Sequence, residues 1–413
     1  MRRTQTVEVI NPRHNDFNAC FNLATISKQL YNVGLYCFRQ ALFNDDLFLS
    51  NKIVYQEMKK NENWNQLPKK ICNQVWKQVC SSWSSWLKAL NEYNKNPSKF
   101  KGKPSLPNYQ KTLNKVVYER GALGVRGLKK NELRLSQTDI ILNISGIKGD
   151  IVEANILPRK NKFIIKVTYK EEITKNNLDY IKVAGIDLGL NNLVAVATNQ
   201  ADIPHILVKG GALKSINQFW NKTVGQLKSM LPKDVFISPK IEQLTDKRNA
   251  KIDNILHKTS RYVVDWLVAH EIGTLIIGKN AQWKDSINLG KRNNQNFVQI
   301  PHARLIDLMT YKFEQANGIV VVQEESYTSK ASALDLDDLP KFRKGCKTRV
   351  IFSGRRVKRG LYKSLQGILV NSDINGAINI IRKVVGDSFM VDLIADKQFI
   401  HHCRQPSAIS LVS

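Results

Sequence analysis

The chain has 413 residues and 42% of them are hydrophobic, which predicts two or more globular domains and excludes a disordered polypeptide. Its 63 Lys and Arg outnumber 35 Asp and Glu, and the net charge of +28 favours a polyanionic partner, for which nucleic acid is the usual candidate. Because it has no apolar run of roughly 18 residues, no secretory signal and no CxxC spacing among its six cysteines, we expect a reduced, cytoplasmic, nucleoid-associated protein without a membrane span.

The first part of the chain changes from a strand pattern to helix patterns. Residues 4–10 alternate like a strand, whereas 22–43 and 68–94 repeat apolar residues at three- and four-residue steps, as amphipathic helices do. The second helix carries three tryptophans, and Trp86, close to Lys88, is the one we expect to be exposed. It is a candidate base-stacking residue, although such a stripe is more often part of a core.

Short strand patterns follow a Pro- and Lys-rich linker at 95–109. They lie at 116–120, 132–136, 139–145 and 162–170, with turn residues between them. A small antiparallel barrel would accommodate these strands together with the one at 4–10. The helical block between them would then be an insertion in the barrel.

From about residue 180 the pattern becomes that of an α/β domain. KVAGIDLGLNNLVAVATN predicts a hairpin of buried strands, and HILVKG at 205–210 a third strand. A long helical stretch at 211–270 precedes a strand (TLIIGKN), a helix (PHARLIDLMTYKFEQANG) and another strand (GIVVVQEE). An antiparallel start with later α/β alternation predicts an α/β ribonuclease-H-like sheet.

Acidic residues stand at three places where these elements begin or end. Asp187 lies inside the apolar strand VAGIDLG, where a charge is costly unless it is paired or binds a metal. Glu324 and Glu325 end the strand GIVVVQEE and project to opposite faces, so only one can face Asp187. Asp373 begins the helix SDINGAINI, where an N-cap role is the alternative.

Carboxylates in this arrangement predict a metal-dependent nuclease. Two Mg²⁺ ions held by such oxygens supply both the nucleophile and the charge neutralisation that phosphodiester cleavage needs. An actin-like ATPase is the alternative, because the phosphate loop of that family also reads GIDLG. No second glycine-rich phosphate loop follows in this chain, and a charge of +28 is unusual for such an enzyme.

Three segments, GIDLGLNNLVAVAT, QEESYTSKAS and SDINGAINI, resemble the RuvC motifs of the TnpB family. TnpB proteins are transposon-encoded, RNA-guided endonucleases related to type V CRISPR effectors. With FKGKPSLPNY and NNQNFVQIPHARLIDLMTYK, the resemblance covers most of 100–385. It implies a wedge β-barrel at 1–12 and 103–178, a helical recognition domain at 13–102, a RuvC nuclease domain at 179–329 and 371–413, and a basic lid insert at 330–370.

The resemblance also implies partners and an activity. It predicts a guide RNA, a double-stranded target DNA next to a short adjacent motif, and cleavage with two Mg²⁺ ions held by Asp187, Glu325 and Asp373. A nuclease-inactive, RNA-guided DNA-binding repressor of the same family is the first alternative. Direct transposition by strand transfer is another.

The chain departs from the family pattern at the second acid. Many relatives carry this acid after the earlier strand, where this sequence has Gly278 and Lys279. We infer that the role has moved to the end of the next strand. Relatives with a shifted acid read E-x-Y-T-S, which matches the segment starting at Glu325 and therefore favours Glu325 over Glu324.

The second departure concerns the zinc ribbon that relatives carry between the second and third motifs. Ser332 and Asp335 occupy the spacing of its first CxxC pair, and Cys346 is the one cysteine left, so we predict no zinc. The segment is basic instead, and we expect a lid that clamps nucleic acid through phosphates, with a solvated loop as the alternative. The residues expected to contact nucleic acid here are Lys341, Arg343, Lys344, Arg355, Arg356, Lys358 and Arg359.

Overall fold

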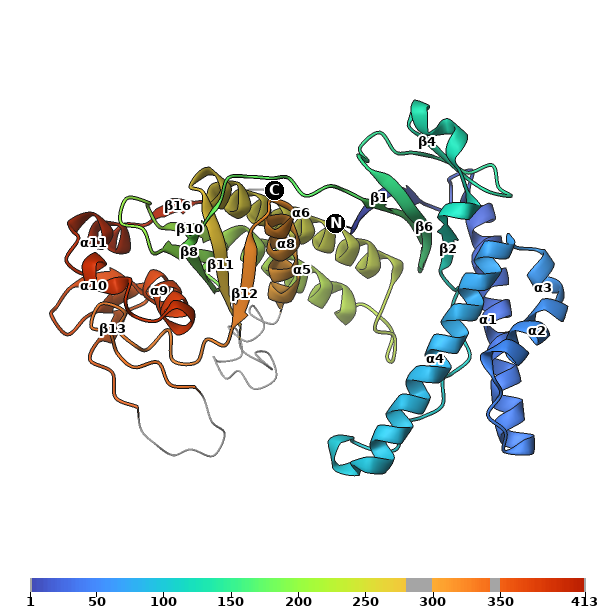
Figure 1. Cartoon of the computed structure of the whole chain (residues 1–413). Helices are drawn as coiled ribbons and strands as arrows, with labels where there is room; N and C mark the ends of the chain where they lie inside the picture. Colours follow the sequence, from blue (N-terminus) through green and yellow to red (C-terminus); the bar gives the residue numbers. More distant parts are fainter. Residues whose placement is uncertain (1, 280–298, 342–349, 412–413) are drawn as a thin grey trace. The chain divides into compact units, whose positions relative to one another are not determined.

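The computed structural model describes residues 2–279, 299–341 and 350–411, and the chain divides into two compact units, Met1–Glu172 and Ile173–Ser413 (Figure 1). The segment 173–178, expected in the barrel, belongs to the second unit, where the Thr174 N–H donates to the Gln315 carbonyl at 2.9 Å. The remaining domain assignments stay predictions. Within the described ranges, no helix combines the length and apolar character needed to cross a membrane.

In the first unit, four helices follow the first strand. The chain runs through β1 (Arg2–Ile10), α1 (Phe17–Asp45), α2 (Asn51–Lys60), α3 (Glu62–Asn65), α4 (Lys69–Lys95) and the short η1 (Pro97–Lys99). It continues through β2 (Val116–Glu119), η2 (Arg120–Ala122), β3 (Leu123–Gly124), η3 (Val125–Lys130), β4 (Glu132–Leu135), β5 (Ile141–Asn143), β6 (Asp150–Arg159) and β7 (Lys162–Lys170). The two long helices lie where the apolar periodicity predicted them, whereas α2, α3 and β6 were not predicted.

The strands of this unit form two sheets, ordered β1-β7-β6-β2 and β3-β4-β5. No pairing between the strands described here closes either sheet, so the barrel is not confirmed. The helices and the sheets share one hydrophobic core. In it Trp83 of α4 stacks on Phe38 of α1, with ring centroids 4.8 Å apart, and this burial explains the apolar stripe of α4.

The second unit begins with three strands and two long helices. These are β8 (Asp179–Leu188), β9 (Asn192–Thr198), β10 (Ile206–Lys209), α5 (Gly211–Ser229) and α6 (Pro239–Ala269). After them come β11 (Ile272–Gly278), α8 (His302–Gln315), β12 (Ile319–Gln323), β13 (Arg355–Lys358), β14 (Leu361–Lys363), β15 (Leu369–Asn371), α9 (Ser372–Val385), α10 (Met390–Leu393), α11 (Lys397–Arg404) and β16 (Ser407–Ile409). The single helical stretch expected at 211–270 is therefore two helices, separated by a segment that contains Pro232.

The main sheet of this unit has the strand order β12-β11-β8-β9-β10-β16. Strands β8, β9 and β10 are antiparallel, whereas β11 and β12 run parallel to β8 on its other side. This is the combination that the sequence predicts for a ribonuclease-H-like sheet. The edge strand β16, which pairs parallel to β10, was not predicted.

The two faces of the sheet are covered by different helices. Residues of even number in β8, such as Ile186, pack with α5, α6 and α8, while Val183 packs with α9. Gly185 allows α9 to lie directly on the strand, because a Cβ there would be 2.3 Å from the Ala377 carbonyl oxygen. Alternation along the strand therefore places Asp187 on the face that α9 covers.

Candidate active site

Asp187 enters the site from the centre of the sheet. Ile186 pairs with Ile277 of β11, which brings Asp187 level with Gly278 at the carboxyl ends of both strands. The helix α9 approaches its side chain closely at Gly376, where a Cβ would lie 2.8 Å from Asp187 Oδ2. Asp187 is therefore enclosed between the sheet and the first turns of α9.

Asp373 lies in the first turn of α9, beside the cap. Asn371 is the N-cap, and its side-chain oxygen accepts the Asp373 N–H at 3.0 Å. Asp373 Oδ2 accepts a hydrogen bond from Asn192 Nδ2 at 2.7 Å, and Oδ1 lies 3.4 Å from Arg356 Nη2 and 3.2 Å from Ser372 Oγ. The capping alternative for Asp373 is thus wrong, because Asn371 provides the cap.

Glu324 and Glu325 have different surroundings just after β12. Glu324 accepts the Ser326 N–H at 2.8 Å and binds the buried Lys383 ammonium at 2.9 Å. The Glu325 carboxylate lies beside Gly278, where a Cβ would come within 2.5 Å of Glu325 Oε2. Of the two acids, Glu325 therefore lies at the strand end next to Asp187.

The three acids form one electrostatic cluster. Burial, followed by the charges of Glu325 and Asp373, raises the pKa of Asp187 well above its usual value, while Arg356 and the Leu188 N–H oppose this effect. Burial, followed by the charge of Glu324, raises the pKa of Glu325 to about 7, and Lys383 opposes it. A bound cation would relieve both effects.

The carboxylates of this cluster fit hard divalent cations. In the described residues, the trio whose ligand atoms all lie within 4.8 Å of one another is Glu8, His14 and Asp16 of the first unit. In the described residues, Asp187, Glu325 and Asp373 do not form so compact a trio. Two ions about 3.5–4 Å apart would be held by carboxylates from all three positions. The lack of a side chain at Gly278 and Gly376 leaves room for the carboxylates of Glu325 and Asp187.

The residues expected to bind nucleic acid lie partly on a hairpin of the insert. Arg355, Arg356 and Lys358 lie on β13, Arg359 follows it, and all four are exposed. Lys341 is exposed as well, whereas Arg343 and Lys344 lie outside the described residues.

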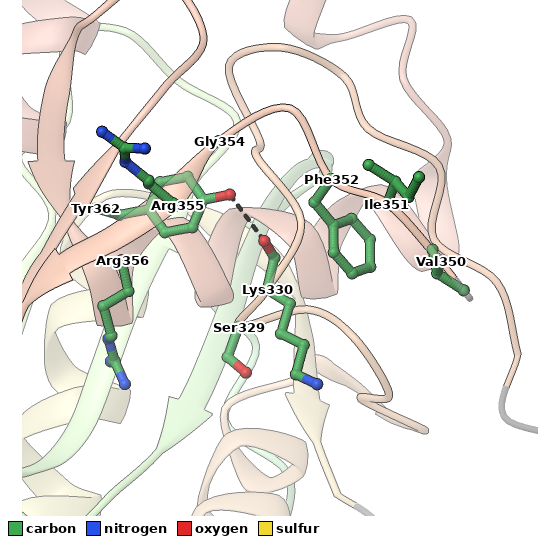
Figure 2. Close-up of a pocket in the computed structure, with 9 residues that line it drawn as sticks. All are labelled: Ser329, Lys330, Val350, Ile351, Phe352, Gly354, Arg355, Arg356 and Tyr362. Atoms are coloured by element: carbon green, nitrogen blue, oxygen red, sulfur yellow. Dashed lines mark hydrogen bonds between the residues drawn. The ribbon is translucent and has the colours of Figure 1, made fainter.

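A pocket of about 540 Å³ lies beside the hairpin and is drawn in Figure 2. Phe352 and Lys330 line it together with Arg355 and Arg356, and the Tyr362 hydroxyl closes one side by donating to the Lys330 carbonyl at 2.7 Å. Since Arg356 also contacts Asp373, this side chain connects the pocket with the acids.

Hydrogen bonds from hydroxyl and N–H groups to two carboxylates connect parts of the insert. They lie where the resemblance would place zinc ligands. Asp335 Oδ2 accepts from Ser332 Oγ at 2.5 Å and from the Leu365 N–H at 2.8 Å. Asp337 accepts the Ser332 N–H at 2.7 Å, the Ser353 N–H at 3.1 Å and the Ser353 hydroxyl at 2.5 Å. We call these residues the carboxylate clasp.

The clasp is anchored to α9 by a buried arginine. Arg382 donates to the carbonyl oxygens of Ser332 at 3.4 Å and Asp337 at 2.9 Å, and to Asn379 Oδ1 at 2.7 Å. Ser332 and Asp335 thus have partners within the chain. Cys346 lies outside the described residues, and the absence of zinc stays a prediction.

Trp86, the expected stacking residue, is half-buried. Its ring lies 4.8 Å from that of Trp83, and its Nε1–H donates to the Pro104 carbonyl at 3.3 Å. These contacts cover part of the ring, and a role in nucleic-acid binding stays a prediction.

Several polar residues around the acids were not identified from the sequence. Asn192 is buried against Asp373, and Lys209 Nζ donates to Asn192 Oδ1 at 3.1 Å. Lys214 contacts Asn191, and Lys383 holds Glu324. The asparagines of GLNN gave no distinct signal, because Asn is common in the tight turns of hairpins.

Comparison with known proteins finds similar sequences for part of this chain. Residues 165–284 match the family model OrfB_IS605, described as a probable transposase. The CRISPR-associated endodeoxyribonuclease Cas12f1 of Sulfoacidibacillus thermotolerans is 28% identical over 248 residues, which is 56% of this chain and 53% of the relative. The TnpB-like protein ORF457 of Acidianus two-tailed virus is 25% identical over 240 residues, which is 55% of this chain and 47% of that protein.

The chain thus spans about half the length of these curated relatives. Among solved structures, that of a Cas12f1-sgRNA-target DNA complex aligns with 87% of this chain and 81% of its own, at 14% identity and a TM-score of 0.49.

Proposed function

We propose that this chain, which belongs to the TnpB family, is an RNA-guided, metal-dependent endonuclease that cuts double-stranded DNA next to a short adjacent motif. The observation that carries the proposal is the convergence of acids from β8, from the end of β12 and from the start of α9. A net charge of +28 supports a nucleic-acid partner. The printed name of Cas12f1 as an endodeoxyribonuclease supports DNA as the substrate.

Asp187, Glu325 and Asp373 would hold two Mg²⁺ ions. Such ions, when bound, supply an activated water and neutralise charge that develops on the phosphate. Carboxylate oxygens in a half-buried site favour these hard cations over softer metals.

Other side chains would keep the acids ready for this role. Lys383 binds Glu324 and so keeps that carboxylate away from the cluster, which leaves Glu325 as the second acid. Asn192 orients Asp373 through a 2.7 Å hydrogen bond. Arg356 is exposed and lies next to Asp373, so its guanidinium can contact the phosphate of a bound strand.

Sequence choice would come from base pairing with the guide RNA, while the protein binds duplex shape and phosphates. The exposed residues of the basic hairpin, Arg355, Lys358 and Arg359, are suited to phosphate contacts. Lys341, Arg343 and Lys344 would also contact phosphates, and Trp86 would contribute a stacking contact.

The test has two steps, both with the full chain. Sequencing the RNA that copurifies is expected to give a defined RNA that ends in a variable guide. A plasmid carrying the matching target is then expected to be cut with Mg²⁺ by the wild-type protein but not by Asp187→Ala, while both bind the RNA equally. Equal cleavage by the variant would contradict the proposal. Guide-dependent DNA binding without cleavage would support the repressor, and tight ATP binding without RNA would support the ATPase.

A further inference from the structure

Two lysines contact the GLNN turn, next to the acid cluster. Lys209, at the end of β10, donates to Asn192 Oδ1 at 3.1 Å, and Asn192 in turn donates to Asp373 Oδ2 at 2.7 Å. Lys214, in the first turn of α5, donates to the side-chain oxygen of Asn191. One amide group therefore separates Lys209 from an acid of the site.

Neither lysine has an acidic partner in the ranges that the structure describes. The pKa of Lys214 is lowered first by burial and then by the charge of Arg359. The side-chain oxygens that hold Lys209 and Lys214 belong to amides, which orient an ammonium group without neutralising it. An anion from outside would neutralise these ammonium groups.

The backbone adds to the positive potential. Helix α5 begins at Gly211 with no acidic residue in its first turn, so its N-terminal dipole is not compensated there. Its position relative to the turn is fixed at Gly210, whose N–H donates to the Asn191 carbonyl at 2.7 Å. A Cβ at Gly210 would lie 2.4 Å from the Leu190 carbonyl oxygen, so this close approach needs glycine.

We propose that Lys209 and Lys214 bind a backbone phosphate of the strand that is being cut, adjacent to the phosphate at the acid cluster. The proposal rests on the proposed function and specifies how its active site holds the strand. A phosphodiester suits the site because it brings a permanent negative charge to cations that the protein itself leaves unneutralised. The link from Lys209 through Asn192 to Asp373 would fix the spacing between this phosphate and the acids.

The test measures how single-stranded DNA binding depends on salt. The full chain is used with its copurified RNA, and it carries Asp187→Ala so that it cannot cleave DNA. Its affinity for a labelled single-stranded oligonucleotide unrelated to the guide is measured at several salt concentrations. The double variant Lys209→Gln/Lys214→Gln is expected to reduce the slope of log affinity against log salt by about 1.4, because each lost contact contributes about 0.7 for a single strand. Lys209→Arg/Lys214→Arg is expected to keep the wild-type slope.

The matched control is Lys222→Gln/Lys228→Gln. It removes two exposed charges from α5, the helix that also carries Lys214. Its slope is expected to remain that of the parent protein. An equal reduction in the control, or no reduction in the Lys209/Lys214 variant while its thermal unfolding stays normal, overturns the proposal. Cleavage by the protein with intact Asp187 is measured separately. A wild-type chain that fails to cut would refute the proposed nuclease activity, and the result on phosphate binding would stand on its own.

Discussion

The carboxylate of Glu325 occupies the space that a side chain on Gly278 would need, with a Cβ at Gly278 only 2.5 Å from Glu325 Oε2. Gln323 pairs with Gly278 across β12 and β11, so Glu325 follows that pair by two residues and extends past the end of its own strand. Glu325, which follows β12, can thereby place its carboxylate beside the end of β11, because β11 has no side chain at Gly278. This relationship is the physical basis for proposing Glu325 as the second acid.

Replacing each glutamate by glutamine distinguishes the two candidates. Glu325→Gln keeps the shape but removes the charge that faces Asp187, so cleavage is expected to fall at least about a thousandfold, or on the order of 4 kcal/mol in the barrier. Glu324→Gln removes the charge that binds Lys383, and cleavage is expected to change by less than about tenfold. Single-turnover rates with saturating target provide the measurement. The reverse ranking would make Glu324 the second acid.

Adding a methyl group at Gly278 should displace the same carboxylate. The Cβ of Gly278→Ala would lie 2.5 Å from both Glu325 Oε2 and Ile380 Cδ1, so stability is expected to fall by about 1–3 kcal/mol and cleavage to be lost. The double variant with Ile380→Val removes one of the two clashes. It is expected to regain thermal stability but not cleavage, and recovery of both would mean that the Glu325 position is not critical.

The raised pKa values predict an unusual dependence of stability on pH. An acid whose pKa is higher in the folded than in the unfolded state binds more protons when folded, so stability is lost as pH rises toward the folded value. For Glu325 this window runs from its usual value of 4.5 up to about 7, and Asp187 is shifted in the same direction. Without divalent ions, raising the pH from 5.5 to 8 should cost on the order of 1–3 kcal/mol.

The measurement is the midpoint of thermal unfolding in chelator, with about 2–4 °C expected per kcal/mol. The control is Asp187→Asn/Glu325→Gln, which lacks both titrating groups and should lose less stability over the same range. Mg²⁺ at pH 8 is expected to restore the wild-type midpoint and to leave the variant unchanged. Parallel pH profiles of the two proteins would show that the acids do not form a strained cluster.

The carboxylate clasp should hold the basic hairpin without a metal. Asp337→Ala removes the acceptor for the Ser332 and Ser353 N–H groups, which is expected to cost about 1–3 kcal/mol and to reduce cleavage through the displaced Arg356. The exposed neighbour Asp338 offers the control Asp338→Ala, for which little change is expected. Unfolding midpoints with and without a zinc chelator check the metal requirement, and a large drop on zinc removal would refute a metal-free clasp.

Much of the second unit could be predicted from the sequence because its strands are buried and its motifs are local. The apolar runs around GLNN indicated the hairpin β8–β9, and the charge of Asp187 within such a run indicated a site. The amphipathic periodicity located α1 and α4 of the first unit to within a few residues. These features depend on neighbours in the chain, and a sequence pattern records them directly.

Tertiary structure alone decided which side chains meet. The sequence favoured Glu325 over Glu324, but the clash at Gly278 and the contact between Glu324 and Lys383 depend on the register of β11 and β12 and on the approach of α9. Lys209 and Lys214 reach Asn192 and Asn191 from the end of β10 and the first turn of α5, and no local pattern marks them. The resemblance to the TnpB motifs thus indicated that β11 lacks an acid at Gly278. The packing of β11 and β12 under α9 determined where the Glu325 carboxylate could lie.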